Sequence, residues 1–435
     1  MESTNPAFGK CIVRINVTRR HRQTIQYILP QHAERATQAE LLVIDEAAAI
    51  PLPTVKSLLG PYLVFLCSTI NGYEGTGRAL SIKLISNLRR EAATTQQTNK
   101  DGKLATGGSR LLREVALAEP VRYSPGDRIE KWLNDLLCLD AADALTPLIT
   151  ALPPPSACEL YEVSRDTLFS AHSASEQFLK KMMALYVSSH YRNTPNDLQL
   201  MSDAPAHRLF VLLAPEDETQ NVLPEILCVI QVALEGAISQ KSARATLAAG
   251  LSPQGDLIPW TMASQFQDEG FPSFTGVRIV RIAVHPDLPR QGYGSRAIQL
   301  IHDYYEGKLT DLREDAEDID VKTNTKHWQE TGKLTEETLK PREDLPPLLT
   351  NLSERKPENV NWIGTSFGLT PELYSYWSKG GYKPVYLRQT ASETTGEHTC
   401  IMLRPCFPVG LDESPDGEWV NSFYEDFRVR FTSLM

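Results

Sequence analysis

The segment Arg281–Ala297 constrains the fold more than any other part of this chain. The run Val277–Val284, which leads into it, is apolar on both faces, and this predicts a central strand of a sheet. A loop with Gly292 and Gly294 follows, and a helix is predicted over Ser295–Tyr305. The two glycines let the backbone approach a ligand closely. The free N–H groups of the loop and of the helix start form a positive concavity that suits a pyrophosphate.

The chain has 435 residues, which is too long for one ordinary domain and predicts two or three. Its composition, 41% hydrophobic and 23% charged, is typical of a globular protein. The sequence contains no apolar run long enough to cross a membrane. Met1–Lys10 lacks the apolar core of a signal peptide.

Cysteine and histidine spacing argues against a metal centre. The seven cysteines are scattered without a Cys-x-x-Cys pair, and the nine histidines show no ligand spacing. This pattern is typical of reduced thiols in an intracellular protein, so we expect neither a disulfide framework nor a metal site. The net charge of −10 indicates that any contact with nucleic acid is local.

The first 150 residues alternate between short apolar runs and helical stretches. Leu41–Ile44 and Tyr62–Cys67 are predicted buried strands, and Ala79–Arg90 is a predicted helix, which together indicate a parallel sheet. Glu91–Gly108 has the composition of a surface loop. Three prolines at Pro153–Pro155 mark a domain boundary.

The second domain is predicted over residues 156–405, with a charged insertion at 307–347. Its expected strands are Glu159–Val163, Arg208–Leu213, Ile226–Leu234, Val277–Val284, Trp362–Phe367, Val385–Leu387 and Cys400–Leu403, and its expected helices are Thr167–Ser189, Ser295–Tyr305 and Pro371–Lys379. Residues 406–435 are too short for a domain. Trp419, Phe423, Phe427 and Phe431 recur every four residues, which places them on one helix face, and we expect this helix to begin a further, truncated domain.

The strand, glycine loop and helix resemble the GNAT acetyltransferase fold. The resemblance implies that loop amides hold the pyrophosphate of acetyl-CoA and that the central strand offers backbone groups to its pantetheine. The implied cofactor-binding residues are Ile282, Ala283, Val284, Pro289, Arg290, Gln291, Gly292, Tyr293, Gly294 and Ser295. Pro289 stands where the family pattern has Gln or Arg, so one side-chain contact is missing there. A strand-to-helix turn that serves packing alone is the alternative.

The helix Pro371–Lys379 with Gly381 and Tyr382 resembles the closing motif of GNAT enzymes. Trp377 stands where many of them carry a tyrosine that protonates the leaving thiolate. Tryptophan donates a hydrogen bond but is not a useful acid, so another group or water must serve. Lys379 is a candidate contact for the CoA phosphates, with a solvated helix-end lysine as the alternative.

Leu41–Ile44 runs into Asp45 and Glu46, an apolar strand ending in two carboxylates. This is the Walker B arrangement, in which Asp45 would hold Mg²⁺ and Glu46 would orient water for ATP hydrolysis. Arg78 and Arg110 are candidate phosphate contacts. An ordinary helix cap is the alternative. The chain contains no Walker A sequence, so we expect ATPase activity to be absent from it.

A helicase-type Walker B segment followed by a GNAT segment resembles the RNA cytidine acetyltransferases, in their eukaryotic form. The resemblance is carried by His21–Ile28, Asp45–Pro51, Gly60–Phe65, Glu130–Cys138, Ser189–Asn193, Asp203–His207 and Gly255–Trp260. It implies an α/β architecture, an incomplete P-loop helicase-like parallel sheet followed by a GNAT mixed sheet with helices. It also implies a nucleolar enzyme that uses acetyl-CoA, and ATP with Mg²⁺ at full length, to acetylate N4 of cytidine in 18S ribosomal RNA and transfer RNA. Ribosome-assembly and tRNA adaptor factors are the implied partners, and the resemblance implies that residues 406–435 begin a truncated C-terminal RNA-binding domain.

The N4 amino group of cytosine is a poor nucleophile, so transfer requires a base and close placement. His190 is the first candidate for the base because a histidine titrates near the working pH. A helix-end histidine bonded to carbonyls is the alternative. Tyr191 and Arg192 are candidates to hold the target RNA. His207 and His285 are weaker candidates for the base, and His285 before a proline suits a structural role.

Two rival functions stay open at this point, a protein lysine acetyltransferase and a catalytically silent ribosome-assembly scaffold, because GNAT folds host many acceptors. The oligomeric state, a homodimer included, also stays open.

Overall fold

A computed structural model describes residues 11–47, 50–68, 89, 112–117, 119, 121–141, 145, 148, 152–189, 195–215, 224–251, 253–309, 345–392, 396–407 and 417–434. The chain divides into two compact units, which are described separately. The smaller unit takes its residues from Met1–Ile70, Glu74–Arg113 and Thr390–Glu397, and the larger from Asn71–Tyr73, Glu114–Gln389 and His398–Met435. In the described part of the chain, no helix is long and apolar enough to cross a membrane.

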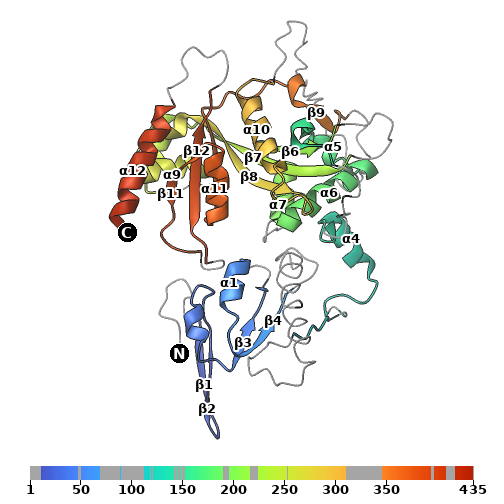
Figure 1. The fold of residues 1–435 in the computed structure, drawn as a ribbon, viewed down its shortest axis with the longest axis vertical. Coiled ribbons are helices and arrows are strands. Elements are labelled where there is room, and N and C mark those ends of the chain that lie inside the picture. Colours follow the sequence, from blue (N-terminus) through green and yellow to red (C-terminus); the bar gives the residue numbers. More distant parts are fainter. Residues whose placement is uncertain are drawn as a thin grey trace, which may run out of the picture. The chain divides into compact units, whose positions relative to one another are not determined.

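The smaller unit contains two small sheets (Figure 1). Strands β1 (Arg14–Thr18) and β2 (Arg22–Gln26) form an antiparallel hairpin. Strands β3 (Leu41–Ile44) and β4 (Leu63–Leu66) pair in parallel, which confirms the predicted parallel arrangement. The predicted helix over residues 79–90 and the loop over 91–108 lie outside the described residues, apart from residue 89.

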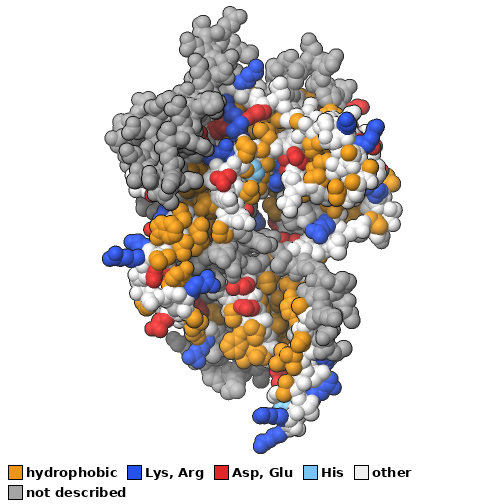
Figure 2. All heavy atoms as spheres, turned by 180° about the vertical axis from the view of Figure 1, so that it is seen from behind, with side chains coloured by type: hydrophobic (Ala, Val, Ile, Leu, Met, Phe, Trp, Pro, Cys, Tyr) orange, Lys and Arg blue, Asp and Glu red, His pale blue; other side chains and the backbone are white. Residues whose placement is uncertain are grey.

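Side chains of β3 and β4 alternate between a small core and the surface, as half-buried strands do. Ile44 of β3 packs with Val55 of helix α1 (Leu52–Ser57) and with Leu58. Hydrophobic side chains also remain at the surface of this unit (Figure 2). The exposed ones on the two strands are Leu41, Val43, Leu63 and Phe65.

The larger unit is built on one eight-stranded sheet in the order β11-β12-β10-β8-β7-β6-β5-β9. Its strands are β5 (Glu159–Val163), β6 (His207–Leu213), β7 (Ile226–Gly236), β8 (Thr275–Val284), β9 (Leu349–Asn351), β10 (Trp362–Gly368), β11 (Lys383–Leu387) and β12 (Thr399–Pro405). Only β8 and β10 pair in parallel among these neighbours, so the sheet is mixed, as expected. The long β7 and β8 lie at the centre; β7 is buried along most of its length, and residues of β8 are buried or half-buried.

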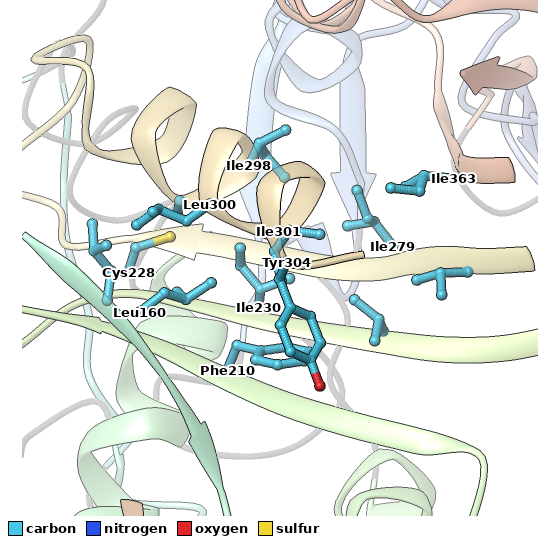
Figure 3. Close-up of a cluster of buried hydrophobic side chains, with 14 of the residues drawn as sticks. Leu160, Phe210, Cys228, Ile230, Ile279, Ile298, Leu300, Ile301, Tyr304 and Ile363 are labelled. Atoms are coloured by element: carbon cyan, nitrogen blue, oxygen red, sulfur yellow. The ribbon is translucent and has the colours of Figure 1, made fainter. Parts of the chain in front are cut away.

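Helix α10 (Tyr293–Tyr305) covers part of this sheet with an apolar face (Figure 3). Ile301 and Tyr304 of α10 point toward strand residues in Figure 3, and both are buried, as is Ile298. The Tyr304 ring meets the ring of Phe210 from β6 edge to face, with centroids 6.0 Å apart. This packing holds the middle and the C-terminal end of α10 against the sheet.

Other helices complete the layers. Helices α5 (Arg165–Leu168), α6 (Ser173–Ser189) and α7 (Pro195–Asp203) pack against a second cluster of buried side chains that includes Leu209, Val211 and Val229. A third cluster joins Ile258 and Met262 of α9 (Leu257–Phe266) to Trp362 of β10. The remaining helices are α4 (Arg128–Leu136), α8 (Gln240–Ala248), α11 (Pro371–Lys379) and α12 (Glu418–Leu434).

Two predicted helices differ from the observed ones. The single helix expected over residues 167–189 is wrong, because the chain forms α5, breaks, and starts again as α6. Ala171 in the break has a left-handed φ of 61°, which interrupts helical hydrogen bonding. Helix α10 begins two residues before the predicted start, so Tyr293 and Gly294 belong to its first turn.

The aromatic stripe of α12 is partly packed on the larger unit. The Trp419 ring lies 5.9 Å from that of Phe271, and the Phe423 ring lies 4.7 Å from that of Phe266. Phe431 remains partly exposed. The expectation that α12 begins a further domain stays a prediction, but its first half already has partners in the GNAT-like unit.

Candidate functional site

The central strands β8 and β10 separate partway along their length. They pair only where Trp362–Thr365 of β10 faces Gly276–Ile279 of β8. Farther along, Ser366 of β10 pairs with β12, whereas Ile282–Val284 of β8 pair with β7 on the opposite side. The backbone of Ile282–Val284 therefore has no ladder on its β10 side in the described structure, and its polar groups there can bond a ligand.

A β-bulge lies where β8 separates from β10. Gln231 of β7 pairs with Arg281, but the next residue, Val232, pairs with Ile279, so Val280 is the extra residue. A bulge bends its strand and redirects the neighbouring side chains, and such features gather near active sites. The sequence pattern gave no sign of this bulge.

The turn after β8 presents backbone amides at the start of α10. Gly292 is the N-cap residue of α10, with a left-handed φ of 96° and no side chain that caps the helix. Arg290 is also left-handed, at 62°. The first intrahelical bond runs from the Arg296 N–H to the Gly292 oxygen at 2.9 Å. The amides of Tyr293, Gly294 and Ser295 precede that bond and have no helical acceptor, which is the arrangement that holds an anion.

Gly294 leaves space that any larger residue would fill. A Cβ atom at Gly294 would stand 3.1 Å from Cγ2 of Val284 and 3.4 Å from the hydroxyl of Tyr376. The absence of a side chain therefore lets the first turn of α10 pack closely against the end of β8. The role of Gly294 in a pyrophosphate cradle stays a prediction.

The proline segment predicted as a domain boundary supports this turn. The Tyr293 hydroxyl donates to the Pro153 oxygen at 2.8 Å, and Arg296 donates to the Ser156 oxygen at 3.4 Å. The ring of Pro155 is the nearest group to the open side of Gly292. These contacts hold the turn in place, so the proline segment packs against the turn between β8 and α10.

The predicted cofactor-binding residues differ in whether their side chains or only their backbone groups can contact a ligand. The side chains of Ala283 and Tyr293 are buried, so only their backbone groups can meet a ligand. Pro289 and Arg290 are exposed on the turn, as are Gln291 and Ser295. The side-chain amide of Gln291 donates to the backbone oxygen of Asp287 at 3.2 Å, and this hydrogen bond restricts the orientation of the side chain. Lys379 is exposed at the last residue of α11.

Trp377 lies in the core. Its ring packs against those of Tyr382 and Tyr376 at 5.1 Å each, and the side chain is 3% exposed. This agrees with the reading that Trp377 is no acid. Tyr376, which the sequence pattern missed, places its hydroxyl beside Gly294 instead. Burial raises the pKa of Tyr376, an effect that the Ser295 hydroxyl partly offsets, so Tyr376 is a neutral hydrogen-bonding group at the turn.

Asp45 and Glu46, the carboxylates predicted as a Walker B pair, directly follow β3. Asp45 accepts the Glu46 N–H at 3.1 Å, and Glu46 is left-handed with φ 46°. The Ala47 N–H then bonds the Cys67 oxygen at the end of β4, at 2.9 Å. Arg78 and Arg110, the candidate phosphate contacts, lie outside the described residues.

The candidate base His190 lies outside the described residues, directly after the end of α6 at Ser189. The candidate RNA contacts Tyr191 and Arg192 lie outside them too. His285 is buried, and its ring accepts the Asp287 N–H at 3.3 Å, which suits the predicted structural role. Within the described residues, no group of three or more His, Cys, Asp or Glu side chains is placed to hold a metal ion.

Comparison with known proteins identifies relatives along the whole chain. The profile of the family described as GNAT acetyltransferase 2 matches residues 181–407. The profile described as RNA cytidine acetyltransferase NAT10/TcmA, helicase domain, matches residues 5–140. The compact units instead divide near residue 113, so the predicted boundary at residue 150 stays a prediction.

The relatives include proteins named RNA cytidine acetyltransferase from Mus musculus and Homo sapiens, each 55% identical over 100% of this chain. A protein of the same name from Saccharomyces cerevisiae is 54% identical over 100% of this chain. The chain spans 43% of the mouse protein and 42% of the other two, less than half of each.

Proposed function

Because the chain belongs to the GNAT acetyltransferase 2 family, we propose that its larger unit transfers an acetyl group from acetyl-CoA to N4 of cytidine in RNA. The observation that carries the proposal is the match of the whole chain, at 55% identity, to proteins named RNA cytidine acetyltransferase. The open turn at Gly292–Gly294 beside the separated strand β8 supports the acetyl-CoA part of it.

The backbone provides most of the proposed cofactor site. The amides of Tyr293–Ser295 would hold the pyrophosphate, and Lys379 would contact a CoA phosphate. Backbone groups of Ile282–Val284 would bond the pantetheine on the side that β10 leaves open. Bound acetyl-CoA supplies the acetyl group as an activated thioester.

The N4 amino group of cytidine must lose a proton during the transfer, so the reaction needs a base. Transfer breaks the C–S bond and forms a C–N bond, while N4 gives up one proton and the departing thiolate takes one up. His190 is the proposed base, since an imidazole accepts a proton near neutral pH. Tyr191 and Arg192 are proposed to hold the RNA beside it.

The smaller unit is proposed to belong to a helicase-type ATPase in the full-length protein. There Asp45 and Glu46 would act on Mg²⁺ and water, with Arg78 and Arg110 on phosphate. Its work would be to release the target base from a paired region, because chemistry on a base requires its extrusion. Small-subunit ribosomal RNA and transfer RNA are the proposed substrates, assembly and adaptor factors the proposed partners, and the nucleolus the proposed location.

The test is acetylation of a small-subunit ribosomal RNA fragment, with N4-acetylcytidine measured by mass spectrometry. We expect His190→Ala to abolish transfer and leave acetyl-CoA binding unchanged, whereas His172→Ala, at an exposed histidine, should leave both transfer and acetyl-CoA binding unchanged. Unchanged turnover in His190→Ala would contradict the assignment of the base. Acetylation of histone-like peptides but not RNA would favour a lysine acetyltransferase, and no acetyl-CoA binding would favour a scaffold.

A further inference from the structure

A strip of polar side chains crosses the face of the larger sheet that carries α6. In the strand register, His207 of β6 pairs with Ala233, and Ala233 pairs with Arg278 of β8. Residues that pair directly lie on the same face, and alternate residues of one strand share that face. The strip therefore contains His207, Gln231, Glu235, Arg278 and Arg281.

Apolar side chains flank the strip on both sides. Leu209 and Val211 continue the same face of β6 beneath α6 and α7, and Ile258 of α9 packs with Trp362 on the other side. Polar groups that interrupt an otherwise apolar face between two clusters are unusual without a ligand or a structural partner. The strip lies between these two clusters, with Gln231 and Glu235 buried and His207, Arg278 and Arg281 half-buried.

The strip adjoins the proposed cofactor strand. Gln231 pairs with Arg281 at the bulge, and Arg281 directly precedes Ile282–Val284. Helix α10 and its amide turn pack with the opposite cluster of buried side chains, which includes Phe210 and Ile230. A cofactor held by that turn would therefore meet its acceptor from the strip's side of the sheet.

The arginines of the strip are already neutralised. Arg278 pairs with Glu235 at 2.5 Å, and Glu235 also accepts the Ile258 N–H at 3.0 Å. Arg281 pairs with Asp197 of α7 at 2.7 Å. Because each cation has its own carboxylate, the strip suits a neutral polar ring better than a phosphate or an ammonium group.

His207 is the strip's partly exposed hydrogen-bonding group. Its Nδ1 lies 2.8 Å from the amide nitrogen of Gln231, which is itself 3% exposed. Burial lowers the pKa of His207, and Arg278 and Arg165 lower it further, so the ring is neutral at pH 7. When Gln231 donates to Nδ1, the ring proton is on Nε2, which has no hydrogen-bond partner among the described residues.

We propose that His207, oriented by Gln231, donates from Nε2 to N3 of the acceptor cytosine and so determines the choice of base. Cytosine N3 accepts a hydrogen bond, whereas N3 of uracil carries a proton and opposes this donor. The contact uses the Watson–Crick edge beside N4, and Gln231, which orients His207, pairs with Arg281 directly before Ile282–Val284. The inference rests on the proposed function for the identity of the acceptor.

The experiment compares the binding of two fluorescent RNA oligonucleotides that differ by one cytidine or uridine, with CoA present. We expect the chain to prefer cytidine by roughly tenfold, as one unpaired buried polar group costs about this factor. His207→Ala should reduce the preference to within about twofold and leave acetyl-CoA affinity unchanged. His172→Ala is the matched control.

Gln231→Glu separates recognition from a structural role. A carboxylate at this position accepts a hydrogen bond from Nδ1–H of His207, so the neutral ring carries its proton on Nδ1. Nε2 then accepts instead of donating, and the preference should shift toward uridine, whose N3 carries a proton. A chain without cytidine preference, or one whose preference survives His207→Ala, would overturn the inference. A preference that depends on His207 in a chain that acetylates no RNA would support the inference and contradict the proposed function.

Discussion

Gly294 and Val284 approach so closely that a Cβ atom on Gly294 would stand 3.1 Å from Cγ2 of Val284. This contact joins the first turn of α10 to the end of β8, where the cofactor amides and the open strand backbone meet. Any side chain at position 294 must displace Val284 or project into the space proposed for acetyl-CoA.

The first prediction concerns this glycine. Gly294→Glu adds bulk and a negative charge at the proposed pyrophosphate cradle, and it should remove acetyl-CoA binding measured by isothermal titration. Gly294→Ala should weaken binding by about tenfold, which corresponds to about 1.4 kcal/mol. Gly270→Ala is the control, because a Cβ there meets only the movable Asp268 carboxylate. Equal affinity in all four proteins would place the cofactor elsewhere.

The second prediction concerns Trp377. Because its ring is buried among aromatic rings, Trp377→Ala should destabilise the fold by about 3–5 kcal/mol, measured by urea unfolding. Trp377→Phe keeps most of the packing, so the acetyl-transfer rate per folded molecule should stay within about twofold. A large loss of kcat in folded Trp377→Phe would show that the indole takes part in the reaction.

The third prediction is a pH dependence of stability. Burial, with Arg404 and Lys308, lowers the pKa of His302 from 6.5 to about 3, and its ring bonds the Tyr382 hydroxyl at 2.8 Å. The folded state therefore binds fewer protons than the unfolded state below pH 6.5, and stability falls as the pH falls from 6.5 toward 3.

This group alone should contribute a slope of up to about 1.4 kcal/mol per pH unit in that window. Unfolding in urea at pH 7.5, 6.5 and 5.5 measures it. His302→Gln keeps a hydrogen bond to Tyr382 but does not titrate, so its stability should fall less steeply than that of the unaltered chain. Parallel curves for the two proteins would be evidence against a neutral buried His302.

The fourth prediction concerns the ion pair of Arg281 and Asp197. With side chains 12% and 27% exposed, the pair is shielded from water, and Arg281 also lies over the Tyr186 ring at 5.9 Å. Arg281→Met and Asp197→Asn should each cost about 1–3 kcal/mol, with a coupling energy of about 1 kcal/mol in the double variant.

The exposed pair Arg244–Glu269 is the matched control for that cycle, since its nitrogen and oxygen also lie 2.7 Å apart but the side chains are 74% and 44% exposed. Screening by water should reduce its coupling energy below about 1 kcal/mol. Equal coupling in the two pairs would mean that burial does not strengthen the Arg281 contact.

The sequence by itself determined the order of elements and the glycine turn. Strand Glu159–Val163 and helix Pro371–Lys379 have the predicted bounds, because alternating and helical apolar periods are local properties of a sequence. The positive φ of Gly292 could be anticipated for the same reason, since glycine is the residue that adopts it without strain.

Tertiary structure alone decided the rest. The bulge at Val280 and the separation of β8 from β10 depend on strand register, which joins residues far apart in the chain. Neighbouring residues Tyr376 and Trp377 face different surroundings because helix packing, and not their spacing, determines which side of α11 meets the turn. The contact between His207 and Gln231 also depends on tertiary structure, because the two residues share a face only once β6 and β7 have paired.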